Sequence, residues 1–181
     1  ALSPAIVIRV PWAASYQEAH LRTPSSTPFA LGTRLPAVDI GGAVWRVELA
    51  DGTFVWLPRA SALDLHHIKQ FSPGQRRELI LATAAQLVGT PYYWGGRSAS
   101  LAALPHQPTG FDCSGLVNVA YRVAGIDIPR DAHEQSLKAQ PVAALQPADL
   151  IFLSAPGEPQ RIVHVMLYAG GNEVIEAPGT G

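Results

Sequence analysis

The sequence has few charged side chains, a single cysteine and no long apolar run. Only 15% of its 181 residues are Asp, Glu, Lys or Arg, and thirteen basic residues nearly balance fourteen acidic ones. Duplex nucleic-acid binding depends on clustered cations that face phosphates, so no nucleic-acid partner is expected. The lone Cys113 excludes an intrachain disulfide, and it makes a structural zinc site, which needs about four ligands, unexpected. No run of about 18 apolar residues occurs, so no membrane span is expected.

The chain is rich in apolar residues, glycine and proline. Hydrophobic residues make up 48% of it, which is enough for a buried core. At roughly 150 residues per domain, the length fits one domain or two small ones. Glycine and proline number 16 each, so many turns and irregular segments are expected.

Short β-type runs dominate residues 1–65. Strands are expected at 6–10, 43–49 and 53–57. Asp51-Gly52 lies between the last two runs and is a hairpin turn signal. The stretch from Gly32 to Leu35, together with Trp45–Gly52 and Trp56-Leu57, resembles bacterial SH3-like domains. Residues 1–65 are therefore expected to form a small SH3-like β-barrel, with an unrelated β meander as the alternative.

The rest of the chain is expected to hold a linker at 66–75, with Ser72-Pro73-Gly74 as a stop, and a second domain at 76–181. Helices are expected over 76–88, ended by Gly89, and from Asp112 to about Ala124, ended by Gly125. A loop rich in glycine and proline covers 89–111. Strands are expected at 150–153, 162–168 and 172–176.

Cys113 follows the helix-capping residue Asp112 and so occupies the first helical position. Unpaired backbone N–H groups and the helix dipole concentrate positive potential there, which favours the nucleophilic thiolate. Ser114 and Gly115 are small and leave room for a substrate over the sulfur. The alternative is that Cys113 is a small buried apolar residue.

A thiolate nucleophile needs a general base, and His164 is the best candidate of six histidines. It lies inside the apolar run 162–168, where a hydrogen-bonded core histidine is the alternative. The other five lie in the N-terminal part, in a proline-rich loop or near a helix start, where surface positions are favoured: His20, His66, His67, His106 and His133.

Glu176 is expected to lie beside His164. If Ala169-Gly170-Gly171 forms a three-residue turn, Tyr168 pairs with Asn172 and His164 pairs with Glu176 on one face. The carboxylate would then fix the imidazole tautomer, as the third member of a catalytic triad does. A two-residue turn would shift the register by one and turn Glu176 to the other face, where it would be an exposed strand carboxylate.

Six short motifs occur in one order: Gly89-Thr90-Pro91-Tyr92-Tyr93-Trp94-Gly95-Gly96, Phe111-Asp112-Cys113-Ser114-Gly115-Leu116, Ile128-Pro129-Arg130-Asp131, Pro147-Ala148-Asp149-Leu150-Ile151-Phe152, His164-Val165 and Ile175-Glu176-Ala177. Over about residues 75–181 they resemble the NlpC family of bacterial cell-wall cysteine peptidases. The resemblance implies a papain-like α+β fold, with the nucleophile helix packed on an antiparallel sheet. It implies Cys113 as nucleophile, His164 as base and Glu176 at a position that is usually histidine. It also implies Tyr92 beside the oxyanion, unless Tyr92 is only a packed aromatic like Tyr93 and Trp94.

Within that family, Pro129-Arg130-Asp131 and an upstream SH3-like domain resemble the γ-D-glutamyl-L-diamino acid endopeptidases. The resemblance implies that Asp131 binds the free amine of an N-terminal L-Ala, unless it only caps a helix, and that Ser114 contacts substrate, unless it is a plain first-turn residue. The implied partner is a murein stem peptide, with no cofactor and no metal. An autolysin acting on N-substituted wall peptides, or an inert wall-binding module, are the alternatives. Wall remodelling implies export and fragment recycling implies the cytoplasm, so both locations stay open.

Overall fold

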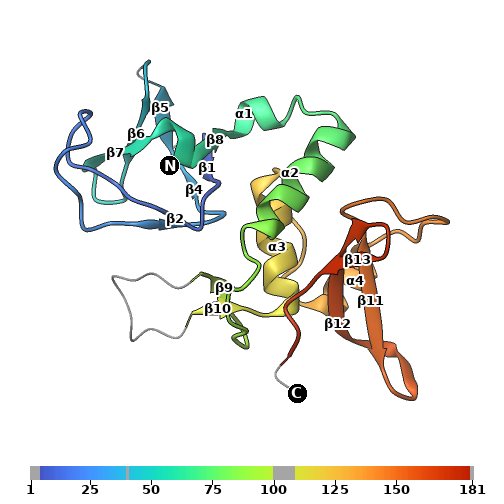
Figure 1. Ribbon diagram of the computed structural model, residues 1–181. Helices are drawn as coiled ribbons and strands as arrows, with labels where there is room; N and C mark the ends of the chain where they lie inside the picture. Colours follow the sequence, from blue (N-terminus) through green and yellow to red (C-terminus); the bar gives the residue numbers. More distant parts are fainter. Residues whose placement is uncertain (1–4, 40, 100–108, 180–181) are drawn as a thin grey trace. The chain divides into compact units, whose positions relative to one another are not determined.

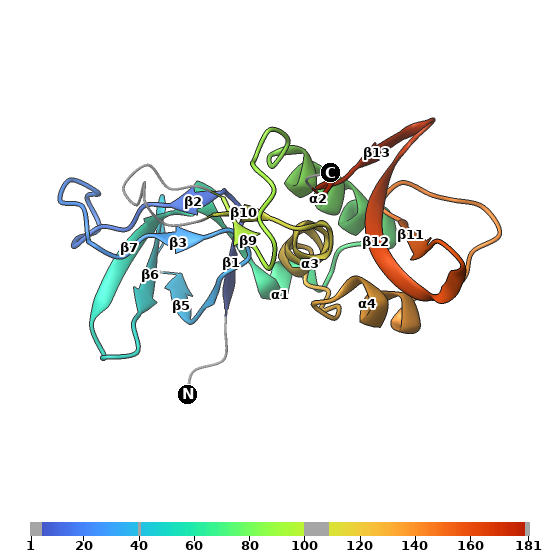
Figure 2. The same cartoon turned by 90° about the horizontal axis from the view of Figure 1, so that it is seen from below.

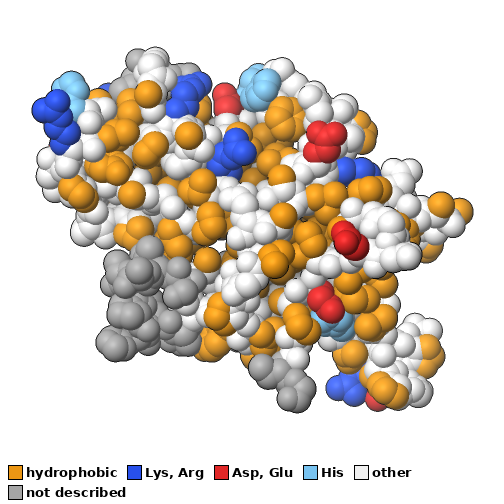
Figure 3. Space-filling model, in the orientation of Figure 1, with side chains coloured by type: hydrophobic (Ala, Val, Ile, Leu, Met, Phe, Trp, Pro, Cys, Tyr) orange, Lys and Arg blue, Asp and Glu red, His pale blue; other side chains and the backbone are white. Residues whose placement is uncertain are grey.

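The computed structural model describes residues 5–39, 41–99 and 109–179. Part of the expected 89–111 loop, residues 100–108 with His106, lies outside the described residues. The chain divides into two compact units, Ala1–Phe71 and Ser72–Gly181 (Figure 1). On the face drawn in Figure 3, charged side chains are scattered among hydrophobic and neutral ones, as the composition implies.

Short antiparallel strands build the first unit. They form sheets in the orders β4-β1-β8, β5-β6-β7 and β2-β3. Their bounds are β1 (Ile6–Ile8), β2 (Trp12–Ala13), β3 (Phe29–Ala30), β4 (Arg34–Leu35), β5 (Ala37–Asp39), β6 (Val44–Glu48), β7 (Phe54–Pro58) and β8 (Ala62–Asp64), with the 3-10 turn η1 (Arg59–Ser61) before β8. The three strands expected from the sequence are present, each with slightly different ends.

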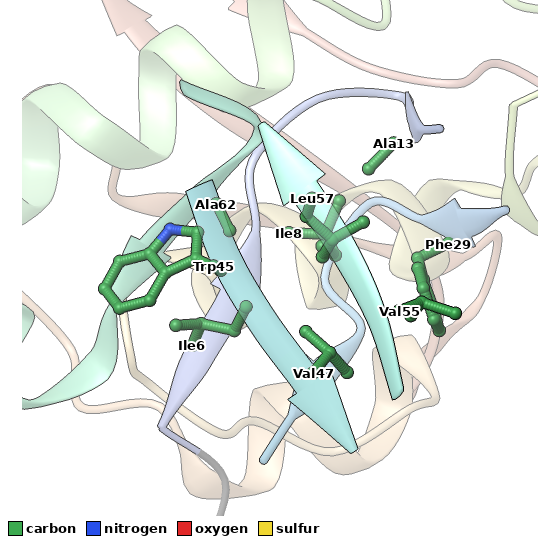
Figure 4. Packing of buried hydrophobic residues seen from close by; sticks show 9 residues of the cluster. All are labelled: Ile6, Ile8, Ala13, Phe29, Trp45, Val47, Val55, Leu57 and Ala62. Carbon is green, nitrogen blue, oxygen red and sulfur yellow. The ribbon is translucent and has the colours of Figure 1, made fainter. Parts of the chain in front are cut away.

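The core of this unit follows from alternation along the strands. Val55 and Leu57 of β7 are buried while Phe54 is exposed, the period-two pattern of a strand with one face inward. Figure 4 shows Val55 and Leu57 packed together with Ile6 and Trp45 from other strands. Between β6 and β7 the chain turns at Asp51-Gly52, where Gly52 has a φ of +82°. An SH3-like class for the unit stays a prediction.

The segment expected as a linker is largely helical. It contains α1 (Leu65–Ile68) and the first turn of α2 (Pro73–Ala85), so the expected helix 76–88 begins and ends three residues early. Ser72-Pro73-Gly74 starts the helix instead of stopping the chain. Ser72 and Gln75 form a reciprocal capping box, and Pro73 fits the first turn, where its missing N–H has no helical partner to lose.

In the second unit, helices pack on a three-stranded antiparallel sheet. The sheet has the order β11 (Leu150–Ala155), β12 (Glu158–Gly170), β13 (Glu173–Ile175). Helix α3 (Cys113–Val123) contacts α2, and both α3 and α4 (Ala132–Lys138) contact β12 (Figure 2). A two-stranded ribbon, β9 (Arg97–Ser98) and β10 (Gly110–Phe111), precedes α3. None of the helices in the described part of the chain is long and apolar enough to span a bilayer.

Close packing around the start of α3 requires a glycine. A Cβ atom on Gly115 would overlap the backbone carbonyl oxygen of Gly96 and would lie 2.9 Å from Asp112 Oδ1. The sequence interpretation that Gly115 leaves room for substrate is therefore wrong: the space it leaves is filled by the loop around Gly96. The loop can approach the helix this closely because Gly115 has no side chain.

Replacing Gly115 with alanine should lower the free energy of unfolding by about 1–3 kcal/mol, because a backbone carbonyl cannot move aside as a flexible side chain can. The matched control is Gly74→Ala in the first turn of α2, where the nearest atom to a new Cβ would be 3.9 Å away. There alanine should be neutral or stabilise by up to about 1 kcal/mol through its higher helix propensity. Urea unfolding measures both, and equal effects would contradict the packing explanation.

Candidate active site

Cys113 is the first residue of α3 and is half-buried. Asp112 caps this helix, as the sequence predicts, and its Oδ1 accepts the backbone N–H of Gly115 at 2.6 Å. The helix continues to Val123 and is buried along most of its length, so packing against the sheet holds its first residue in place. The thiol is thus carried on a rigid element, at the positive end of the helix dipole.

Arg130 joins the Asp112 side chain to two other segments. Its two terminal nitrogens donate to the two Asp112 oxygens, with Nη1–Oδ1 at 2.9 Å and Nη2–Oδ2 at 2.6 Å. Nη1 also donates to the Ser114 hydroxyl at 2.8 Å. The Asp112 carboxylate additionally accepts the N–H of Gly95 at 2.9 Å. One ion pair therefore ties the Gly95 loop, the start of α3 and the segment before α4 together.

The balance of forces on Asp112 favours its charged form. Partial burial alone raises the pKa of this carboxyl group, but hydrogen bonds from Arg130 and from the N–H groups of Gly115 and Gly95 outweigh it, with the Arg130 charge adding to them. The net pKa of Asp112 lies below the ordinary value. The carboxylate thus stays ionised and paired next to the thiol.

His164 lies on β12 and Glu176 directly after β13. His164 Nε2 and Glu176 Oε2 are 2.6 Å apart, so the hydrogen bond expected from the sequence is present. An ionised carboxylate only accepts hydrogen bonds, so in the neutral form of the ring Nε2 carries the hydrogen and Nδ1 is the nitrogen that can accept a proton. The Glu176 side chain is 34% exposed and that of His164 19%.

The hairpin reaches this contact by a different register from the one expected. Tyr168 pairs with Val174, not with Asn172, and Gly170 pairs with Glu173 across a two-residue turn. By itself a two-residue turn would place Glu176 on the wrong face. A register shift between Tyr168 and Gly170 adds one residue, Ala169, and restores the face. The expected pairing of His164 with Glu176 is wrong, but their shared face is kept.

The structure brings five of the six sequence-predicted site residues to one cleft. This cleft has a volume of about 670 Å³, and its walls include Tyr92, Cys113, Ser114, Asp131 and His164. The sixth residue, Glu176, lines an adjoining cavity of about 450 Å³, and Tyr92 lies in the walls of both. The cleft therefore combines a thiol, an imidazole and hydroxyl donors on one surface.

Tyr92 is placed beside the helix start by the backbone, since it forms a bridge with Phe111, the residue before Asp112. Burial raises the pKa of Tyr92, and the nearby Cys113 and Asp112 charges raise it further against the opposing Arg130. The hydroxyl is thus held protonated and able to donate a hydrogen bond.

Asp131 occupies the N-cap position of α4, but its side chain makes no capping hydrogen bond. The interpretation that the Asp131 side chain caps the helix is therefore wrong. The carboxylate is exposed in the cleft and has no hydrogen-bond or ion-pair partner among the residues that the structure describes. It is available to a positively charged ligand.

Comparison with known proteins identifies the family. The model of the NlpC/P60 family matches residues 89–181, about half of the chain. The chain belongs to the NlpC/P60 family.

Relatives and solved structures agree with this membership. A gamma-D-glutamyl-L-lysine dipeptidyl-peptidase of Bacillus cereus is 31% identical over 155 residues, 84% of this chain and 44% of that protein. The peptidoglycan endopeptidase RipB of Mycobacterium tuberculosis is 34% identical over 129 residues, 68% of this chain and 52% of that protein. The crystal structure of an NlpC/P60 family protein from Bacillus cereus matches with a TM-score of 0.74 at 28% identity, covering 97% of this chain and 54% of that one. The α+β fold expected for the second unit is confirmed, and the chain spans about half the length of these relatives.

Several residues of this NlpC/P60 cleft were missed by sequence reasoning. Arg130 was noted only as a neighbour of Asp131, because the Asp112 side chain that it binds is 18 residues away in the sequence. Trp94, 83% exposed, and Arg161 line the cleft without any distinctive spacing. His133 is exposed, as expected, and also lines the cleft. No group of three or more His, Cys, Asp and Glu side chains suited to a metal ion gathers among the described residues.

The Asp112–Arg130 pair should make stability in this NlpC/P60 domain depend on pH. Because folding lowers the pKa of Asp112, its contribution is full above the unfolded pKa and is lost as pH falls through the folded one. Arg130→Gln should lower the unfolding free energy by about 1–3 kcal/mol near neutral pH and flatten the loss of stability between about pH 5 and pH 3.

Urea unfolding at a series of pH values measures this effect. The exposed pair Arg122–Asp127, with Nη1 and Oδ1 3.4 Å apart, provides the control. Arg122→Gln should change stability by less than about 1 kcal/mol and leave the acid limb as in the wild type. An unchanged acid limb in Arg130→Gln would refute the assignment.

Proposed function

We propose that the chain is a cysteine peptidase that hydrolyses the γ-D-glutamyl–L-diamino acid bond of murein stem peptides and prefers a free N-terminal L-Ala. The observation that carries the proposal is the 2.6 Å hydrogen bond from His164 to Glu176, at a cleft that also holds Cys113 at a helix start. The names of relatives, a gamma-D-glutamyl-L-lysine dipeptidyl-peptidase and a peptidoglycan endopeptidase among them, support the substrate class.

In the proposed acylation step, His164 Nδ1 takes the thiol proton and the Cys113 thiolate attacks the γ-carbonyl carbon of D-Glu. Negative charge develops on the carbonyl oxygen. The Tyr92 hydroxyl and the Cys113 backbone N–H would donate hydrogen bonds to it. The imidazolium is stabilised by Glu176 and then gives its proton to the departing amine as the C–N bond breaks.

Deacylation uses the same groups in reverse. His164 takes a proton from water, and the resulting hydroxide adds to the carbonyl of the thioester. The C–S bond then breaks, and the thiolate leaves and recovers its proton from the imidazolium. The products are a free γ-carboxylate and the amine of the diamino acid.

Asp131 is proposed to bind the L-Ala ammonium, because its carboxylate faces the cleft unpaired among the described residues and a fixed carboxylate recognises an ammonium by charge-assisted hydrogen bonds. Ser114 is proposed to contact the substrate from the same wall. The Ser114 hydroxyl already donates to Asp112 at 3.3 Å and accepts from Arg130. These two hydrogen bonds fix the position of the Ser114 side chain in the cleft wall.

Cys113→Ala and His164→Ala should each abolish hydrolysis of L-Ala-γ-D-Glu-L-Lys, measured by mass spectrometry of the products. Glu176→Gln should lower kcat by about 10²- to 10⁴-fold, because the amide cannot stabilise the imidazolium as a carboxylate does. The matched control is Glu173→Gln on the same hairpin, where the side chain is exposed and lies outside both cavities. A Cys113→Ala protein with full turnover would exclude this mechanism, and an inactive wild type whose thiol does not react with iodoacetamide near pH 6 would favour the inert module.

Free and N-acetylated copies of the same peptide should separate the proposed activity from that of an autolysin. The free peptide should have the higher kcat/KM, and Asp131→Asn should raise its KM by about ten- to a hundredfold while changing the acetylated copy little. Glu134→Gln, a neighbouring acidic residue in the first turn of α4 that does not line the cleft, is the control. Equal rates on both peptides would remove Asp131 from amine binding.

A further inference from the structure

Several charged groups around the cleft are already held by partners. Asp112 is paired with Arg130 through two hydrogen bonds, and Glu176 is paired with His164. Two charged side chains in the cleft wall are left outside these pairs: Asp131, which is negative, and Arg161, which is positive. These two contacts hold the geometry of the cleft, so Asp131 and the more loosely paired Arg161 are the charged side chains of its wall that a ligand can engage.

Arg161 is held only weakly by its own surroundings. Its one recorded partner among the described residues is Glu158, with Nη1 and Oε1 3.2 Å apart. Both side chains are more than half exposed, 66% and 57%. An ion pair of this kind contributes little to stability, so the guanidinium can exchange Glu158 for another carboxylate at small cost.

An irregularity in the sheet explains why Arg161 shares a cleft with His164. In a regular strand, residues three apart point to opposite faces. Leu153 pairs with His164 and Ser154 with Ile162, so β12 has one extra residue at Val163. Ala155 then pairs with Glu158, and this second register shift lies across the segment 159–161, which ends at Arg161. Such a bulge bends the strand and re-aims the side chains around it. The four consecutive residues Arg161–His164 accordingly all line the cleft.

We propose that Arg161 binds the free α-carboxylate of the γ-linked D-Glu residue, and so determines specificity for an acidic over an amidated substrate. This rests on the proposed function. The acyl half of that substrate, L-Ala-γ-D-Glu, carries one ammonium and one carboxylate. The cleft offers one carboxylate with no partner among the described residues, Asp131, and one weakly held guanidinium, Arg161, which is the matching pair of charges. A guanidinium can hold a carboxylate with two parallel hydrogen bonds.

The test compares two peptides that differ in one group: L-Ala-γ-D-Glu-L-Lys and its α-carboxamide, L-Ala-γ-D-isoglutaminyl-L-Lys. The wild type should favour the carboxylate peptide in kcat/KM. Arg161→Gln should lower kcat/KM for that peptide by about ten- to a hundredfold and change the carboxamide less than about threefold. Arg161→Lys should restore part of the loss, because it keeps the charge without the bidentate geometry.

Three control variants sharpen the result. Arg122→Gln removes an exposed arginine with a similar ion pair outside the cleft and should leave both peptides unchanged. Glu158→Gln removes the competing carboxylate and should leave or raise activity on the acidic peptide. His133→Gln removes another basic side chain of this wall, one outside the Asp112–Arg130 and His164–Glu176 pairs, and loss of discrimination there but not in Arg161→Gln would overturn the assignment. So would an equal loss on both peptides, or no loss, in Arg161→Gln.

Binding measurements keep this inference separate from the proposed catalysis. In a Cys113→Ala background, calorimetry should show that the dipeptide L-Ala-γ-D-Glu binds more tightly than L-Ala-γ-D-isoglutamine, and that Arg161→Gln removes the difference. If the wild type hydrolyses neither tripeptide, the proposed function fails while this comparison still decides the role of Arg161. If the two dipeptides bind equally in the Cys113→Ala protein, the inference fails whatever the activity.

Discussion

The ion pair between Asp112 and Arg130 is the interaction on which the geometry of the cleft depends. One carboxylate caps α3, holds the backbone of the Gly95 loop and takes both terminal nitrogens of the arginine. The residues that follow each partner in sequence, Cys113 and Asp131, are the proposed nucleophile and the proposed amine ligand. A single contact between side chains therefore sets the relative positions of two functional groups that are 18 residues apart in the chain.

Close approach of backbones supports the same contact. Arg130 can reach Asp112 and the carbonyl of Gly96 together only because the Gly96 loop lies directly on the helix at Gly115. The polar groups gathered there satisfy one another, so the partly buried carboxylate keeps its charge at low cost. Packing and electrostatics thus act on the same few atoms.

Local signals in the sequence were sufficient for the elements that carry the chemistry. The aspartate before Cys113 and the glycine after Ala124 predict α3 closely, because capping is decided within a few residues. The shared face of His164 and Glu176 was expected from strand alternation only if the turn had three residues. The register could not be predicted, since the bulge at Ala169 depends on how Gly170 and Gly171 turn the chain. The turn is one residue shorter than expected and β12 has one extra residue at Ala169. Together these two differences leave Glu176 on the expected face.

What sequence reasoning missed is what depends on contacts between distant segments. Arg130 and Gly115 have ordinary local surroundings, and only their neighbours in space give them a role. The same holds for Arg161, whose place in the cleft follows from a bulge that no local pattern marks. In a chain with so few charges, pairing decides which of them a ligand meets. A charge matched by a rigid partner fixes structure and discriminates little between ligands, whereas a charge with a weak partner gains most when a complementary group arrives. Substrate specificity in this cleft is therefore expected to depend on the charged side chains whose partners within the fold are weakest.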